Sequence, residues 1–240
     1  MSVEIQVVED PASACCAMLV DTAARGGHIV LSGGSTPQAA YEQFADAIRS
    51  ADLDVSKTTF WFGDERCVPP DDERSNYAMV KRSLLDPLSD RPLPAVHRMK
   101  GELGPDEAAA AYERELDAAG PPDFDLVLLG VGPDGHTESL FPDQPSLQER
   151  SRLVLGVQQA GFEPFVSRVT LTLPALARGR RLVFLAAGES KARPVAAAFA
   201  AGAKPDPHVP SSLVPPLGRE VLVLLDSSAA HELPLGEEAG

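Results

Sequence analysis

The chain has 240 residues, of which 44% are hydrophobic, and a formal net charge of −14 from 35 acidic and 21 basic residues. This hydrophobic content is ordinary for a globular protein, and the length fits one large α/β domain or two small ones. The acidic balance argues against a nucleic-acid partner, because binding to phosphate backbones requires a clustered basic surface. It leaves room for a small anionic ligand in a local pocket of Arg and Lys, since exposed charges are screened beyond roughly 8 Å.

Cysteine usage and the N-terminus bear on the compartment. The three cysteines, Cys15, Cys16 and Cys67, show neither metal-ligand spacing nor a disulfide framework, which is typical of a reducing compartment. The first ten residues, MSVEIQVVED, lack the apolar core of a signal peptide, and no run approaches the ~18 apolar residues of a membrane span. We therefore expect a cytoplasmic protein with no membrane partner and no bound metal.

Short apolar runs alternate with longer amphipathic segments along the chain. The alternation indicates βαβ units, and continuously apolar runs such as DLVLLG fit strands covered on both faces. The sequence therefore predicts an α/β fold that is Rossmann-like, with a largely parallel sheet and helices on both faces. The predicted strands are residues 5–8, 28–31, 59–62, 125–129, 152–157, 168–173, 182–186 and 221–225, and the predicted helices are 37–49, 77–85, 106–119 and 190–201.

No change in composition resembles a linker between domains. The proline-rich stretch 204–218 is followed by only one further predicted strand, so we interpret it as a long loop. We expect a single domain over residues 1–232 and an acidic, frayed tail over 233–240.

A glycine turn follows the predicted strand 28–31. In open parallel sheets the ligand crevice lies at the carboxyl ends of the strands, so the residues after each strand are informative. Gly33 and Gly34 let the backbone approach a ligand closely, and Ser35 and Thr36 lead into a helix with Pro37 in its first turn. A helix N-terminus suits a phosphate group. The turn 33–36 is thus a candidate phosphate site, although the same residues could form only a tight connection.

Charged residues follow the predicted strand 59–62. Arg66 could make a two-pronged contact with phosphate, and Asp64 could position a sugar hydroxyl or stabilise Arg66. The alternative is a surface salt-bridge cluster of little energetic value. Ser75 and Asn76 are good caps for the helix that begins near residue 77.

The segment GVGPDGH (130–136) is the most specific one. Three glycines within six residues predict a loop wrapped around a ligand, with His136 at its tip. Histidine takes and returns a proton near neutral pH, and Asp134 could hold the imidazole in one tautomer. A structural hydrogen bond is the alternative role for this histidine.

Two further basic residues are weaker candidates. Arg168 begins the segment RVTLTLPAL, and Lys191 lies in the first turn of a predicted helix, where a bound anion would also meet the helix N-terminus. Either side chain alone could be a solvated charge.

Taken together, these segments resemble the 6-phosphogluconolactonase family, a branch of the glucosamine-6-phosphate isomerase/deaminase-like superfamily. They occur in the family's order. The resemblance implies a NagB-like fold and hydrolysis of 6-phospho-D-glucono-1,5-lactone to 6-phospho-D-gluconate in the oxidative pentose phosphate pathway, with no cofactor. The matching segments are LSGGSTP (31–37), GDERCVP (63–69), SNY (75–77), GVGPDGHTESLFP (130–142), RVTLTLPAL (168–176) and GESKA (188–192).

The resemblance also implies roles for individual residues. The histidine that matches His136 promotes attack of water on the lactone carbonyl. From its spacing to His136, we expect Asp134 to be the second catalytic residue. Glu138 departs from the family's pattern, because many members have a small residue there, often Ala. The positions expected to bind the phosphate or the sugar are Gly33, Gly34, Ser35, Thr36, Asp64, Arg66, Gly135, Arg168 and Lys191.

The sister deaminases provide a comparison within the superfamily. They carry a Glu five residues after the histidine, where this chain has Phe141, and Asp-Glu-Tyr where this chain has Asp-Glu-Arg at 64–66. Both differences favour the lactonase. The alternatives are a glucosamine-6-phosphate deaminase or sugar-phosphate isomerase, and a non-catalytic effector domain that binds sugar phosphates. We expect a monomer, with a weak homodimer as the alternative.

Overall fold

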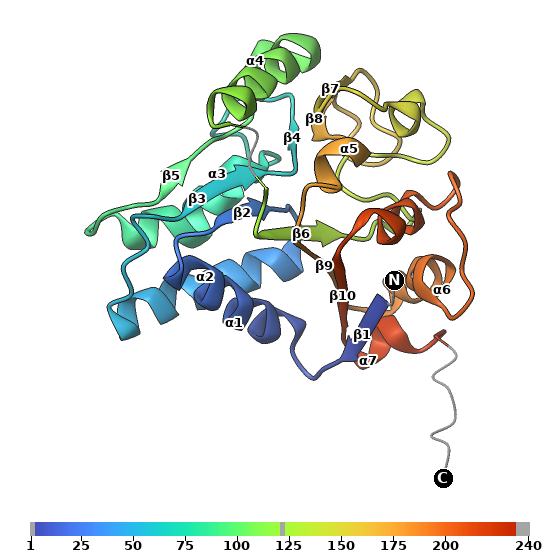
Figure 1. Ribbon diagram of the computed structural model, residues 1–240, viewed down its shortest axis with the longest axis horizontal. Helices are drawn as coiled ribbons and strands as arrows, with labels where there is room; N and C mark the ends of the chain where they lie inside the picture. Colours follow the sequence, from blue (N-terminus) through green and yellow to red (C-terminus); the bar gives the residue numbers. More distant parts are fainter. Residues whose placement is uncertain (1–2, 121–122, 234–240) are drawn as a thin grey trace.

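The computed structural model describes residues 3–120 and 123–233, and its centre is a parallel sheet (Figure 1). Within these residues the main sheet has seven strands in the order β1-β10-β9-β6-β2-β3-β5, and every neighbouring pair is parallel. The predicted α/β fold is therefore confirmed. Its strands are β1 (Val3–Val7), β2 (His28–Leu31), β3 (Thr59–Phe62), β5 (Ala95–Val96), β6 (Leu126–Gly130), β9 (Arg181–Ala186) and β10 (Glu220–Leu225).

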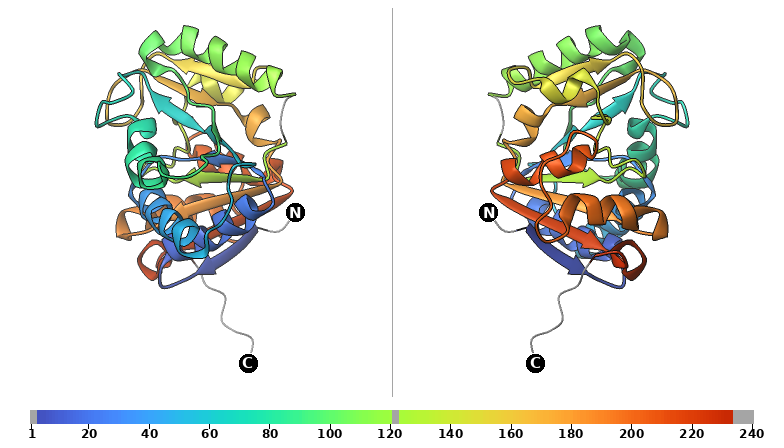
Figure 2. Two further views of the ribbon diagram at one scale, coloured as in Figure 1. Left: turned by 90° about the vertical axis from the view of Figure 1, so that its left-hand side faces the viewer. Right: turned by 90° about the vertical axis from the view of Figure 1, so that its right-hand side faces the viewer.

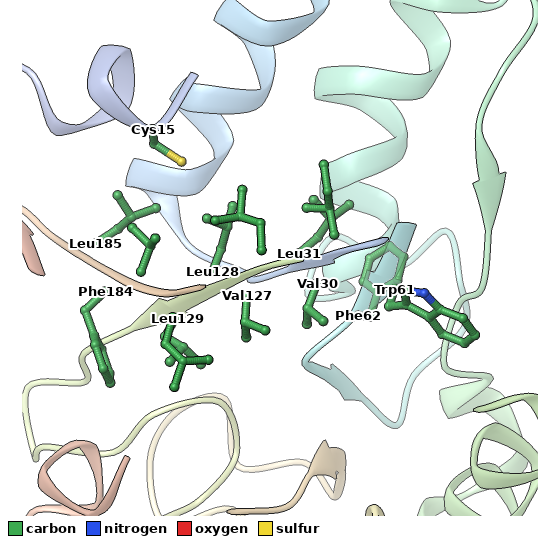
Figure 3. Packing of buried hydrophobic residues seen from close by; sticks show 14 of the residues in the cluster. Cys15, Val30, Leu31, Trp61, Phe62, Val127, Leu128, Leu129, Phe184 and Leu185 are labelled. Carbon is green, nitrogen blue, oxygen red and sulfur yellow. The ribbon is translucent and has the colours of Figure 1, made fainter. Parts of the chain in front are cut away.

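Helices cover both faces of this sheet. α1 and α2 lie on one face, and α6 lies on the other, where the ring of Phe199 packs 4.8 Å from that of Phe184 (Figures 1 and 2). Side chains of successive residues alternate between the two faces: Leu128 points toward α1 and α2, whereas Val127 and Leu129 point away (Figure 3). The helices are α1 (Pro11–Ala24), α2 (Ser35–Ala51), α3 (Asn76–Val80), α4 (Pro105–Ala118), α5 (Leu173–Leu176), α6 (Ala192–Phe199) and α7 (Ser227–Ala230).

A second, antiparallel sheet corrects part of the prediction. The segments predicted as strands at 152–157 and 168–173 do not join the parallel sheet. They form β7 (Val154–Val157) and β8 (Arg168–Leu171), which pair with β4 (Asp64–Arg66) in the order β4-β8-β7. α4 packs over this small sheet (Figure 2). A short apolar run does not reveal which sheet it joins, and β4 was predicted only as residues after a strand.

Gly63 connects the two sheets. Its N–H donates to the carbonyl of Leu31 in the main sheet (3.0 Å), and its carbonyl accepts from the N–H of Leu171 in the small sheet (2.7 Å). The predicted strand over 168–173 was too long by two residues, because the Thr172 side chain accepts from the N–H of Ala175 (3.3 Å) and begins α5.

The remaining element boundaries shift by a few residues. α2 begins at Ser35, two residues before the predicted start. The helix predicted at 77–85 is α3 followed by a π-helical turn, Lys81–Leu85. The loop 204–218 contains two 3-10 turns, Pro210–Leu213 and Pro215–Leu217.

At the C-terminal end, Leu233 is buried with the hydrophobic core, whereas residues 234–240 of the expected tail lie outside the described residues. Among the helices of the described ranges, none has the length and apolar character that crossing a bilayer requires.

Replacing Leu128 should measure how much the central strand contributes to stability. Its side chain is fully buried beneath α1 and α2 (Figure 3). Leu128→Ala should lower the free energy of unfolding by about 2–5 kcal/mol, because it removes buried methyl groups and leaves a cavity. Leu93→Ala is the control: Leu93 is 42% exposed, so the loss should stay within about 0.5 kcal/mol. Both free energies of unfolding are measured by urea denaturation. Equal decreases for Leu128→Ala and Leu93→Ala would contradict the assignment of Leu128 to the core.

Candidate active site

A cavity of about 320 Å³ opens at the carboxyl ends of β2, β6 and β9. It brings together residues from segments that are far apart in the sequence. Of the predicted site residues, those on its wall are Gly33, Gly34, Ser35, Thr36, Asp64, Arg66, His136, Arg168 and Lys191. Asp134 and Gly135 are not on the wall but lie next to His136 in the same loop.

The turn between β2 and α2 forms one wall of the cavity. Gly34 has φ = +110°, which glycine adopts without the strain of a side chain, and no side chain caps the helix that begins at Ser35. The first N–H groups of α2 therefore face the cavity without partners inside the helix. The hydroxyl of Tyr41 fixes the turn from behind, since it accepts from the N–H of Ser32 and donates to its carbonyl, both at 2.9 Å.

Asp64 lies at the junction of several elements, and it is 5% exposed. One carboxylate oxygen accepts from Asn76 Nδ2 (2.7 Å), and the other accepts from Ser139 Oγ (2.5 Å). Asn76 was predicted as a helix cap, but its side chain binds Asp64 instead. Ser75 is the cap, because its hydroxyl accepts from the N–H of Ala78 (3.1 Å). Asp64 thus ties β4, α3 and the loop after His136 together.

Arg66 and Arg168 bring positive charge to the same wall. Arg66 donates through Nη1 to the carbonyl of Arg74 (2.5 Å), while its buried Nε has no partner among the described residues. Arg168 donates to the carbonyl of Pro164 (2.8 Å), and its Nη1 lies 3.9 Å from Asp64 Oδ2. Burial lowers the pKa of Arg168, and the neighbouring charge of Asp64 partly offsets this effect.

His136 and Asp134 form a hydrogen-bonded pair at the end of β6. Asp134 Oδ1 lies 2.5 Å from Nδ1 of His136 and 3.2 Å from its backbone N–H. The loop needs glycine at 132, because a Cβ there would overlap both side chains of the pair. Burial opposes ionisation of Asp134, but the hydrogen bond and charge of His136 outweigh it and lower the pKa of Asp134. This contact leaves Nε2 as the ring nitrogen available for chemistry.

Gly135 shapes the loop that carries His136 and does not line the cavity. It has φ = +85°, and a Cβ there would press on Val209 of the 204–218 loop. Its carbonyl accepts from the N–H of Ser211 (2.9 Å). The long proline-rich loop therefore supports the catalytic loop from outside the cavity.

Lys191 faces the cavity from the segment after β9. It ends a 3-10 turn, Glu189–Lys191, that precedes α6, which is where the sequence predicted a helix start. Burial lowers the pKa of Lys191, and the negative charge of Asp134 opposes that shift. A partly desolvated ammonium group of this kind gains from contact with an anion.

Three residues outside the predicted set of site residues lie on the cavity wall or against His136. Phe162 lies on the loop after β7, and its ring centroid is 5.6 Å from that of His136. Phe141 packs on the same imidazole at 4.9 Å. Glu138, which the sequence marked only as a departure from the family pattern, also lines the wall. Nothing in the sequence places Phe162 near His136, because the loop 158–167 has no motif.

The cavity has the composition of a sugar-phosphate site. Basic side chains and an uncapped helix N-terminus suit a phosphate, and Asp64 suits a hydroxyl group. Over residues 3–120 and 123–233, no three His, Cys, Asp or Glu side chains gather as they would to hold a metal ion.

Comparison with known proteins places the chain among sugar-phosphate enzymes. Residues 4–223 match the family described as glucosamine-6-phosphate isomerases/6-phosphogluconolactonase, and the chain belongs to this family. A 6-phosphogluconolactonase from Streptomyces coelicolor is 36% identical over 95% of this chain and 91% of its own.

Solved structures agree with this assignment. A 6-phosphogluconolactonase from Trypanosoma cruzi has a TM-score of 0.83 at 29% identity and covers 98% of each chain. A monomeric glucosamine-6-phosphate deaminase of the NagB superfamily has a TM-score of 0.78 at 20% identity, covering 97% of this chain and all of its own. The latter likeness shows the fold alone.

The Asp134–His136 contact predicts a pH-dependent contribution to stability. Because the folded-state pKa of Asp134 lies below the ordinary value of 3.8, its stabilising effect is present above pH 3.8 and is lost as the pH falls through the folded-state value. Asp134→Asn should therefore lower the unfolding free energy by about 1 kcal/mol near pH 6, and this deficit should shrink in acid. Urea unfolding over a pH series measures the deficit.

Asp46→Asn is the control, since Asp46 is exposed on α2. It should change stability little at any pH. A deficit for Asp134→Asn that stays constant through the acid range would contradict the assigned contact between the Asp134 carboxylate and His136.

Proposed function

We propose that this chain hydrolyses 6-phospho-D-glucono-1,5-lactone to 6-phospho-D-gluconate. The observation that carries the proposal is that His136, held by Asp134, shares one cavity with the glycine turn 33–36 and Lys191. A side chain that can transfer protons and a group of residues that can bind an anion therefore line the same cavity. The family of the chain includes proteins named for this activity.

The phosphate group is bound at the basic end of the cavity. The first N–H groups of α2 donate to it, and Lys191 and Arg66 supply positive charge. This anchoring fixes the lactone ring so that C1 lies beside His136. Holding the reactants in place in this way removes much of the entropic cost of the reaction.

Hydrolysis then proceeds by general base catalysis. Asp134 accepts a hydrogen bond from Nδ1 of neutral His136, so Nε2 takes a proton from a water molecule that attacks C1. The C1–oxygen bond to water forms, the bond from C1 to the ring oxygen breaks, and the imidazolium returns its proton to that oxygen. A lactone is a constrained, activated ester, so this step requires no covalent nucleophile.

The deaminase alternative lacks its proton-transfer group. Phe141 occupies the position five residues after the histidine, it is 1% exposed, and its ring packs against His136. A phenyl ring cannot carry a proton. Release of ammonia from glucosamine 6-phosphate by this chain would nevertheless favour the deaminase. Binding of 6-phospho-D-gluconate without hydrolysis of the lactone would favour the non-catalytic effector domain.

We also propose that the enzyme acts as a cytoplasmic monomer. All proposed binding and catalytic side chains come from one chain, which supports the monomer. The three cysteines are free thiols, as is usual in a reducing compartment.

His136→Ala tests the proposed base. Turnover of the lactone, measured with spontaneous opening subtracted, should fall by about 10²–10⁴-fold, because the imidazole that takes the proton from the attacking water is lost. Affinity for 6-phospho-D-gluconate should change little, since the phosphate contacts remain. His231→Ala, at an exposed histidine after α7, should behave as the unaltered chain. Full activity in His136→Ala would remove this residue from the mechanism.

Lys191→Ala tests the anion site. Losing one charge-assisted contact should raise KM for the lactone by about tenfold and affect kcat less, because the phosphate group takes no part in the bond changes. Steady-state kinetics separate the two constants. The matched control is Lys204→Ala, at an exposed lysine in the proline-rich loop. An unchanged KM in a folded Lys191→Ala protein would exclude phosphate contact at this position.

A further inference from the structure

Glu138 is a buried carboxyl group on the cavity wall, and its side chain makes no internal hydrogen bond. It is 6% exposed, and neither of its carboxyl oxygens has a partner among the residues that the structure describes. Its backbone is in the left-handed region, with φ = +50°, which a residue with a side chain adopts at a cost. An unpaired buried polar group also destabilises a protein.

A neighbouring glutamate shows what a structural carboxylate looks like in this fold. Glu65 is 3% exposed, but it accepts four hydrogen bonds at 2.7–2.9 Å. The donors are the N–H groups of Arg66, Asn76 and Tyr77 and the hydroxyl of Ser75. Glu65 holds the start of α3 in place, whereas the Glu138 carboxyl holds no element in place.

Glu138 lies beside Asp64. Its carboxyl packs directly against Gly63, where a Cβ would overlap it, and the next residue, Ser139, donates to Asp64. Burial raises the pKa of Glu138 well above its ordinary value, and the nearby charge of Asp64 raises it further. Both effects favour the protonated form of the carboxyl, which can donate a hydrogen bond.

The charges of Asp64 and Glu138 decide which part of a ligand can bind beside these two residues. Asp64 is negative and surrounded by donors, so a phosphate dianion beside it would be repelled. A ring hydroxyl both donates and accepts, and so it can satisfy an ionised carboxylate and a neutral carboxyl together.

We infer that Glu138 is a positioning and specificity residue, whose carboxyl forms a hydrogen bond with a hydroxyl group of the lactone ring beside Asp64. The inference rests on the proposed function for the identity of the ring. Glu138 lies two residues after His136, so a hydroxyl held there fixes the ring relative to the base. Phosphate binding remains with the 33–36 turn and Lys191.

The experiment combines variants of Glu138 with analogues of the lactone. Glu138→Ala, Glu138→Gln and the unaltered chain are each assayed on the natural lactone and on analogues that lack one ring hydroxyl. Glu138→Ala should lower kcat/KM for the natural lactone about tenfold, mainly by raising KM. The amide of Glu138→Gln can still donate a hydrogen bond, so this variant should retain most of the original kcat/KM. With the analogue that lacks the contacted hydroxyl, Glu138→Ala and the unaltered chain should be equal.

Thermal unfolding separates this role from a structural one. Glu138→Ala should have a Tm equal to or above that of the unaltered chain, because it removes an unpaired buried carboxyl. Glu42→Ala removes an exposed carboxyl from α2 and should change neither kinetics nor Tm. Full activity of Glu138→Ala, the same fold-loss on every analogue, or a clearly lowered Tm would each overturn the inference.

Failure of the proposed function would be recognised separately. If the unaltered chain does not hydrolyse the lactone, the proposed function is wrong. Calorimetric titration of 6-phospho-D-gluconate into the unaltered chain and into Glu138→Ala would then still decide the inference. Weaker binding by about tenfold in the variant would support the contact, and equal binding would overturn it.

Discussion

Parallel pairing of β2, β6 and β9 is the constraint on which the cavity depends. Because the three strands run in the same direction and in register, their carboxyl ends meet at one edge of the sheet. The glycine turn after β2, the His136 loop after β6 and Lys191 after β9 are separated by tens of residues in sequence. A strand running the other way would carry its group to the opposite edge, so the topology itself brings the proposed anion site and the proposed base together.

The small antiparallel sheet supplies what the parallel sheet alone lacks. Gly63 passes the chain from β3 into β4, and Arg168 then lies opposite Arg66 in the β4–β8 pair. Both guanidinium groups reach the cavity wall by this route, as does Asp64. Asp64 is hydrogen-bonded to α3 and to the loop after His136, so a change there would disturb several elements together. The second sheet thus adds two arginines and Asp64 to the cavity wall, while His136 and Lys191 come from segments that follow strands of the first sheet.

Local patterns allowed prediction wherever one segment determined its own structure. The strands at 28–31 and 59–62 were predicted to the residue, because each is a continuously apolar run with clear turn signals. The pairing of β7 and β8 with β4 was missed, since pairing partners depend on contacts that are distant in sequence. The same reason explains the site: glycines and a histidine after a strand could be recognised locally, whereas the contact between His136 and Phe162 exists only in three dimensions.

The cavity wall holds polar groups that folding alone does not favour. Burial lowers the pKa of both Lys191 and Arg168, and Arg66 has a buried Nε without a partner among the described residues. Each of these is a cost in the free protein, and each is a donor that an anionic, hydroxylated ligand would satisfy. Glu138 fits the same logic, since its buried carboxyl oxygens also have no partner among the described residues. In the proposed function, this arrangement places the charged end and the hydroxylated ring of the ligand against different groups, and His136 acts where the ring carries its carbonyl.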